Sequence, residues 1–134
     1  MIIGIGCDIV DIDKTLRLGW KNDVDILNRI FSKNEIALES GLETERYYSS
    51  RFAIKEAVLK CLGIGMEDGI ALNDIEIQKI DGGGLKVKLK GRIKKIADSK
   101  HITHWFVSLS HSQEQSIAFV IADNQGANFP NKYK

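Results

Sequence analysis

The chain opens with an apolar run that has no helical period. Residues 2–10 are apolar apart from two glycines and one aspartate, which predicts a buried strand that ends near Asp8. Asp11 or Asp13 follows where a side-chain oxygen could cap a helix over 14–21. The start of the chain is therefore predicted to run from strand into helix.

Helix signals continue through the middle of the chain. A helix is predicted over about 23–31, and Ser32 and Glu35 then have the spacing of a capping box, which starts a third, short helix. The longest helical pattern covers about 44–62 and is stopped by Gly63. Helices thus dominate the first half.

The second half changes to a period of two. Alternation over 75–78 and 85–89, joined by the glycine-rich residues 81–84, predicts a β-hairpin. After a short helix, two further strands are predicted over 104–110 and 116–122. Helices followed by antiparallel strands define an α+β fold, with an N-terminal strand and helices followed by an antiparallel sheet.

Length and composition favour one compact domain. The chain has 134 residues, of which 43% are hydrophobic, and no linker divides residues 1–123. Residues 124–134 hold the only proline and little apolar content, which indicates a loose tail. Lys and Arg total 19 against 18 Asp and Glu, so the net charge of +1 argues against a general nucleic-acid binder.

Cysteine usage and hydropathy point to a cytoplasmic protein. Cys7 and Cys61 are far apart and form no CxxC motif, so neither a disulfide framework nor a zinc site is indicated. The apolar residues around Cys7 predict a buried side chain. No apolar run approaches the ~20 residues that cross a bilayer, and the N-terminus lacks a basic segment.

The long helix is not a simple amphipathic one. Its charged face carries Arg51, Lys55, Glu56 and Lys60. Phe52 and Leu59 interrupt this face, which predicts that it lines a cleft or a subunit contact. The alternative is an exposed stripe with a Glu56–Lys60 pair four residues apart.

Four features have residue types suited to a metal ion and an anion. They are Asp8, Glu35, the pair Glu56 and Lys60, and the dipeptide Ser110-His111. Two carboxylates from separate elements can hold magnesium, and nearby cationic side chains can neutralise phosphate. Each feature also has a structural interpretation, as a helix cap, a capping-box residue, a surface pair or a turn.

Four strings together resemble the holo-acyl-carrier-protein synthases, the small bacterial 4'-phosphopantetheinyl transferases. They are GIGCDIVDI at 4–12, FSKNE at 31–35, RFAIKEAVLKCLGIG at 51–65 and WFVSLSH at 105–111. The resemblance implies transfer of the phosphopantetheine arm of coenzyme A to a serine of apo acyl carrier protein, which releases adenosine 3',5'-bisphosphate and supports fatty acid biosynthesis. It also implies a homotrimer with active sites between protomers.

The same resemblance assigns site residues. It makes Asp8 and Glu56 the magnesium ligands and places Lys60, Arg51 and His111 around the phosphates of coenzyme A, with Asp8, Glu56 and Lys60 as the catalytic residues. The proton acceptor stays open between Glu56, Glu35, Asp8 through a metal-bound water, and a free water. A phosphohydrolase and a non-catalytic nucleotide-binding module are the competing functional classes.

The resemblance also predicts where the acidic carrier protein docks. Lys14, Arg17, Leu18 and Lys21 would share one face of the helix over 14–21 and give a cationic stripe around an apolar anchor. The alternative is a solvated amphipathic helix. Two departures from the family pattern stand out: Lys14 replaces a common arginine, and Arg46 is the only base in 39–46, which puts phosphate contacts there in doubt.

Overall fold

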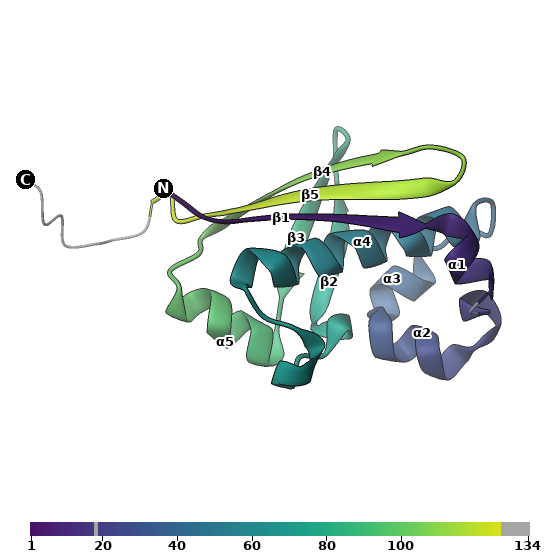
Figure 1. Ribbon diagram of the computed structural model, residues 1–134, viewed down its shortest axis with the longest axis horizontal. Coiled ribbons are helices and arrows are strands. Elements are labelled where there is room, and N and C mark those ends of the chain that lie inside the picture. The colour runs from purple at the N-terminus through teal and green to yellow at the C-terminus, as the bar shows by residue number, and fades with distance from the viewer. Residues whose placement is uncertain (18, 127–134) are drawn as a thin grey trace, which may run out of the picture.

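Helix α4 (Thr44–Leu62) runs through the middle of the molecule, and the other elements surround it (Figure 1). The computed structural model describes residues 1–17 and 19–126, apart from the side chains of residues 15–17 and 67. The remaining elements are β1 (Ile2–Asp11), α1 (Ile12–Arg17), η1 (Trp20–Asn22), α2 (Val24–Ile30), α3 (Lys33–Ala37), η2 (Met66–Asp68), η3 (Leu72–Asp74), β2 (Ile75–Ile80), β3 (Gly84–Leu89), α5 (Gly91–Ser99), β4 (His104–His111) and β5 (Gln115–Asp123).

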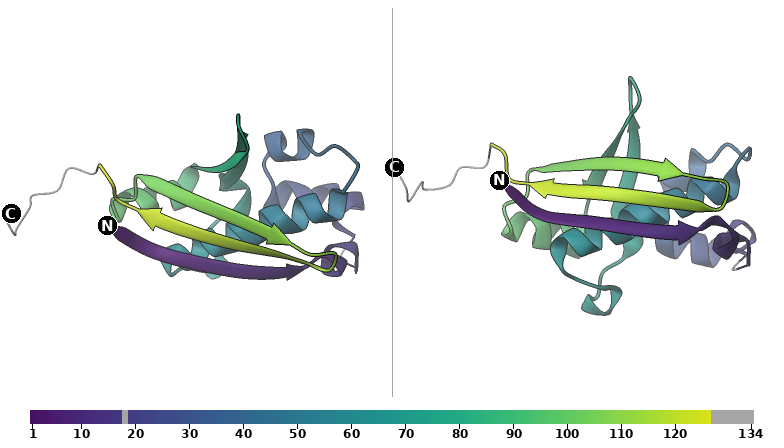
Figure 2. Two further views of the ribbon diagram at one scale, coloured as in Figure 1. Left: turned by 90° about the horizontal axis from the view of Figure 1, so that it is seen from above. Right: turned by 45° about the horizontal axis from the view of Figure 1, so that its top comes forward.

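Two antiparallel sheets lie against α4. The order of the larger sheet is β1-β5-β4, so the first strand pairs with the last, and Asp8 lies opposite Ala118. The hairpin β2–β3 forms the second sheet and crosses behind α4, while α1 to α3 lie at one end and α5 at the other (Figures 1 and 2). The α+β prediction is confirmed, with two sheets in place of one.

Glycines bring β1 unusually close to α4. A Cβ atom added at Gly4 would lie 2.1 Å from the carbonyl oxygen of Cys61, and one at Gly6 would lie 1.9 Å from that of Ala57. Only a residue without a side chain allows this approach of two backbones. Because strand residues alternate, Asp8 is the next residue on the same face and is carried onto the helix.

Local capping follows the sequence at several helix ends. Ser32 and Glu35 form the expected capping box, and Gly63 ends α4 with a left-handed φ of 66°. The prediction of one helix over 14–21 is wrong, because α1 ends at Arg17 and Gly19 turns the chain with a φ of 65°. No helix in the described part of the chain is long and apolar enough to cross a membrane.

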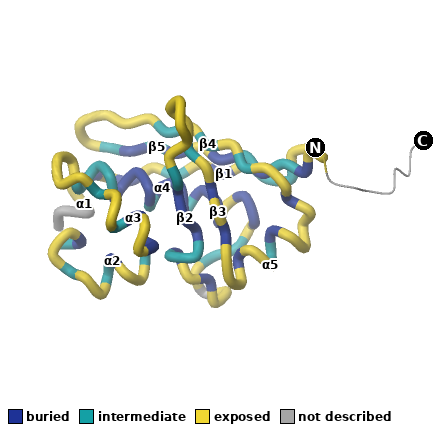
Figure 3. Tube along the Cα trace, turned by 180° about the vertical axis from the view of Figure 1, so that it is seen from behind, coloured by how far each residue is buried: buried dark blue, intermediate teal, exposed yellow. Residues whose placement is uncertain are grey.

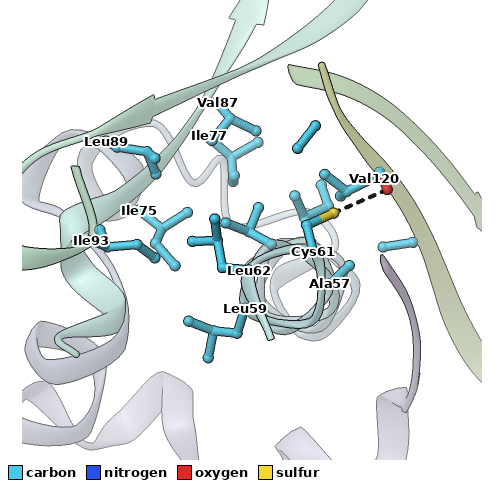
Figure 4. Packing of buried hydrophobic residues seen from close by; sticks show 14 of the residues in the cluster. Ala57, Leu59, Cys61, Leu62, Ile75, Ile77, Val87, Leu89, Ile93 and Val120 are labelled. Carbon is cyan, nitrogen blue, oxygen red and sulfur yellow. Dashed lines mark hydrogen bonds between the residues drawn. The ribbon is translucent and has the colours of Figure 1, made fainter. Parts of the chain in front are cut away.

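The main core packs around α4 between the two sheets (Figure 4). Cys61 is buried there, and its Sγ donates to the carbonyl oxygen of Val120 at 3.2 Å. Leu59 is also in this core, and Phe52 packs edge-on against Trp20 at 5.1 Å between ring centroids. Phe52 also lines a cavity beside Glu56, so the predicted cleft is confirmed there, whereas the buried Leu59 belongs to the core. The alternative of a subunit contact stays a prediction.

The outer face of the β1-β5-β4 sheet is apolar and exposed. Its most exposed large residues are Ile5, Ile9, Phe106 and Phe119. Figure 2 shows that none of the described helices covers this face, and Figure 3 shows exposed and partly buried positions alternating along β4. Cys7 lies on this face and is exposed, so its predicted burial is wrong. The glycines and Asp8 occupy the helix side of β1, which sends Cys7 outward.

Most of the predicted tail, residues 124–134, lies outside the described residues. Its first residue, Asn124, is buried and joins the two ends of the described chain. The Asn124 amide donates to the carbonyl oxygen of Met1 at 3.1 Å, and the Met1 ammonium donates to Asn124 Oδ1 at 2.8 Å.

Candidate active site

Three predicted catalytic residues meet where β1 lies on α4. Lys60 Nζ donates to Asp8 Oδ1 at 3.0 Å and to the carbonyl oxygen of Cys7 at 2.9 Å. Asp8 and Glu56 line one cavity of about 600 Å³. The wall of this cavity, here called the carboxylate cavity, also includes Ile9, Val10, Asp11, Lys14, Trp20, Phe52 and Gln115. The structure thus brings Asp8, Glu56 and Lys60 together.

The charges in the carboxylate cavity act on one another. Burial raises the pKa of Glu56, the negative charge of Asp8 raises it further, and the positive charge of Lys60 opposes both effects. The hydrogen bond to Asp8 raises the pKa of Lys60. Because the Lys60 side chain is 53% exposed, its charge is available to a ligand.

These carboxylates fit a magnesium ion. The described residues hold no group of three or more His, Cys, Asp or Glu side chains placed to bind a metal. Magnesium does not need such a group, since it usually keeps several waters and takes one or two protein carboxylates with phosphate oxygens. Asp8 and Glu56 supply two hard oxygen donors, and a cation held by both would relieve the repulsion by Asp8 that, after burial, raises the pKa of Glu56.

Arg51 and His111 line a different cavity, of about 570 Å³, together with Arg46. This space is here called the arginine cavity. The Nε atoms of Arg46 and Arg51 are both buried and have no hydrogen-bond partner among the described residues. Buried donors without partners cost free energy unless a ligand or water accepts a hydrogen bond from them. The arginine cavity is therefore suited to an anion such as phosphate.

Arg46 is a candidate that the sequence did not single out. Its only signal was its isolation as the one base in 39–46, which argued against a role. The structure places it one to two turns before Arg51 on α4 and beside His111 on β4. Its neighbour in space comes from a strand more than sixty residues away, which no local pattern could indicate.

Glu35 lies away from the carboxylate cavity. Its side chain is 1% exposed, and Oε1 accepts from Lys55 Nζ at 2.6 Å and from the Ser32 amide at 2.9 Å. Its other oxygen accepts from the Ile77 amide at 3.2 Å. A carboxylate held by these donors organises the fold, so the remaining candidates for the proton acceptor are Glu56, Asp8 through a metal-bound water, and a free water.

The predicted docking residues do not form one helical stripe. Lys14 lines the carboxylate cavity, whereas Lys21 lies beyond the turn at Gly19 and pairs with Glu45 Oε1 at 3.1 Å. The side chain of Arg17 and the whole of Leu18 lie outside the described residues. Lys14 is therefore part of the wall of the candidate active site, whereas Lys21 ties η1 to α4.

The fold and this site agree with the chain's relatives. Residues 4–120 match the family model of the 4'-phosphopantetheinyl transferase superfamily, to which the chain belongs. Holo-[acyl-carrier-protein] synthase of Geobacter sulfurreducens is 36% identical over 124 residues, which cover 92% of this chain and 98% of the relative. The synthase of Syntrophus aciditrophicus is 39% identical over 124 residues, with 92% and 97% covered.

Solved structures give the same result. Holo-[acyl-carrier-protein] synthase from Neisseria meningitidis superposes with a TM-score of 0.83 at 28% identity and covers 92% of this chain and 99% of its own. The synthase from Helicobacter pylori, solved in complex with coenzyme A, has a TM-score of 0.77 at 28% identity, with 89% and 99% covered. The fold of this chain is that of the holo-acyl-carrier-protein synthases.

Proposed function

We propose that this chain transfers the 4'-phosphopantetheine moiety of coenzyme A to a serine of apo acyl carrier protein, and that it does so in the cytoplasm, in support of fatty acid biosynthesis. The observation that carries the proposal is the meeting of Asp8 and Glu56 in one cavity, with Lys60 bonded to Asp8, in a chain whose relatives are holo-acyl-carrier-protein synthases. The two products are holo carrier and adenosine 3',5'-bisphosphate.

The chemistry requires charge neutralisation and positioning. A serine hydroxyl attacks the β-phosphorus of the coenzyme A pyrophosphate, and the bond to the bridging oxygen breaks as the bisphosphate leaves. Magnesium, held by Asp8 and Glu56, would supply further positive charge at the phosphates when bound. Lys60 donates to a phosphate oxygen from its exposed position, and Arg51 and His111 bind phosphate from the arginine cavity.

We further propose that the active site is completed by a second copy in a homotrimer. Two observations support this. Within one chain the catalytic carboxylates and the predicted phosphate binders Arg51 and His111 line separate cavities. The outer face of the β1-β5-β4 sheet, with Ile5, Phe106 and Phe119 exposed, is the kind of apolar surface that protomers bury.

The carrier protein is proposed to dock over α1 and η1. Lys14 lies at the wall of the carboxylate cavity, where a serine of an acidic partner would have to arrive. Arg17, Leu18 and Lys21 stay proposed members of this surface because they flank Lys14 along the chain. Positive charge here would guide an acidic partner toward the cavity.

A transfer assay with mass spectrometry tests the proposed activity. The protein is incubated with coenzyme A, magnesium and a panel of apo acyl carrier proteins, and the carrier should gain about 340 Da, the mass of the transferred group. Coenzyme A consumed without any gain would favour the phosphohydrolase. Coenzyme A bound without turnover would favour the nucleotide-binding module.

A further inference from the structure

The guanidinium of Arg51 rests on the ring of Tyr47, one turn earlier on α4. Its central carbon lies 3.9 Å from the ring centroid, well inside the range of a cation–π interaction. Arg51 is only 6% exposed, so solvent screens this interaction weakly. The ring therefore restricts the guanidinium to one plane.

Tyr47 is itself anchored. Its hydroxyl donates to the main-chain carbonyl oxygen of Glu35, whose carboxylate is held by Lys55, Ser32 and Ile77. Burial raises the pKa of Tyr47, so the hydroxyl stays protonated and keeps donating at neutral pH. The ring is thereby fixed to a rigid, buried polar network.

The donors of Arg51 are poorly used inside the protein. One terminal nitrogen donates to Ser50 Oγ at 3.3 Å, whereas Nε is buried and has no partner among the described residues. Arg51 lines the arginine cavity and also a second cavity of about 560 Å³, whose wall includes Gln78 and Lys79. A guanidinium held in place with donors to spare is prepared for an anion.

We infer that Tyr47 is a positioning residue that holds Arg51 in the orientation in which it binds a phosphate group of coenzyme A. The inference rests on the proposed function for the identity of the ligand. A free arginine side chain loses several rotamers on binding a phosphate, and a guanidinium already fixed by a ring loses fewer. Tyr47, which also lines the arginine cavity, thus strengthens nucleotide binding through the orientation that it gives to Arg51.

Equilibrium binding of adenosine 3',5'-bisphosphate by calorimetry tests this without any transfer step. Tyr47→Leu, which removes the ring, should weaken binding about tenfold, and Tyr47→Phe, which keeps the ring and loses its anchor, about two- to threefold. In the transfer assay the KM for coenzyme A should rise in proportion, while kcat and the KM for the carrier change less than about twofold. Tyr48→Phe is the matched control for loss of a tyrosine hydroxyl from the same helix, and it should bind as the wild type does.

A double-mutant cycle with Arg51→Ala separates positioning from general destabilisation. Once Arg51 is absent, Tyr47→Leu should weaken binding no further, whereas independent effects would multiply. Multiplicative losses, or wild-type affinity in Tyr47→Phe and Tyr47→Leu, would overturn the inference. If Tyr47→Leu does not fold, the same cycle with Tyr47→Phe decides the matter. A chain that binds the bisphosphate through Tyr47 and Arg51 but modifies no carrier would refute the proposed function and leave this inference standing.

Discussion

Two lysines five residues apart on α4 have opposite surroundings. Lys55 and Glu35, the buried pair, are 0% and 1% exposed, and Lys55 Nζ also contacts the carbonyl oxygens of Ile30, Leu72 and Ile75. Lys60 and Asp8, the open pair, join the same helix to β1, but Lys60 is 53% exposed. The same residue type is therefore enclosed by the protein at one position and open to a ligand at the other.

The electrostatics of the two pairs differ in the same way. Burial lowers the pKa of Lys55, an effect that the Glu35 carboxylate opposes, so the pair depends on complete hydrogen bonding. The hydrogen bond to Asp8 raises the pKa of Lys60, which stays charged beside solvent. A phosphate can compete for Lys60, whereas every position around Lys55 Nζ is filled by the protein.

The largest expected effect comes from removing Asp8 or Glu56 from the carboxylate cavity. Asp8→Ala and Glu56→Ala should each lower transfer at least about 1,000-fold and leave the fold intact, because the site loses a magnesium ligand and part of its charge balance. The measurement is carrier modification across a magnesium titration, with circular dichroism for the fold. Asp98→Ala, an exposed carboxylate on α5, is the control. Near wild-type turnover in either variant would show that the substituted residue is not a magnesium ligand.

The two lysines should separate stability from activity. Lys55→Met should lower the free energy of unfolding by about 3–5 kcal/mol, because it leaves Glu35 buried without its partner. Lys60→Met should cost less than about 1 kcal/mol in unfolding free energy yet reduce transfer about 100-fold. Urea unfolding at one protein concentration and the transfer assay measure both quantities. Equal stability losses in the two variants would contradict the contrast between the pairs.

Periodicity and capping predicted the strands, the capping box and the end of α4 at Gly63. They could not distinguish Lys55 from Lys60, because burial of a charge depends on a partner such as Glu35, twenty residues away. Likewise the outward direction of Cys7 depends on which face of β1 meets α4. Residue types identified Asp8 and Glu56 as candidates, while their meeting in one cavity needed the β1–α4 packing that Gly4 and Gly6 allow.

A smaller effect is expected at the docking surface. Reversing Arg17 and Lys21 to Glu should raise the KM for the carrier about three- to tenfold and weaken its dependence on salt, because both positive charges belong to the proposed docking surface for an acidic partner. The KM for coenzyme A should stay nearly unchanged. Lys100→Glu, at the far end of the molecule after α5, is the matched control. Because Lys21 pairs with Glu45, thermal melting must accompany the kinetics. An unchanged carrier KM would move the docking surface elsewhere.

The smallest effect concerns a buried group on α4 and gives a pH dependence. Burial raises the pKa of Cys61 to about 11. In the unfolded chain the pKa of a thiol is about 8.5, so the stability that the neutral thiol contributes is complete below that pH and is lost as the pH rises toward 11. The free energy of unfolding of the wild type, measured with urea, should therefore fall more steeply over this pH range than that of Cys61→Ala. Parallel curves of unfolding free energy against pH would show that the Cys61 thiol is not buried in the core.

The central claim, that the carboxylate cavity of one copy and the arginine cavity of another form one active site, is tested most directly by mixing subunits. Glu56→Ala and Arg51→Ala chains are coexpressed with different affinity tags, and assemblies that carry both tags are purified. In either mixed trimer one site of three keeps both residues, so activity should return to about a third of wild type. Activity no higher than that of the inactive parents would show that each site lies within a single chain.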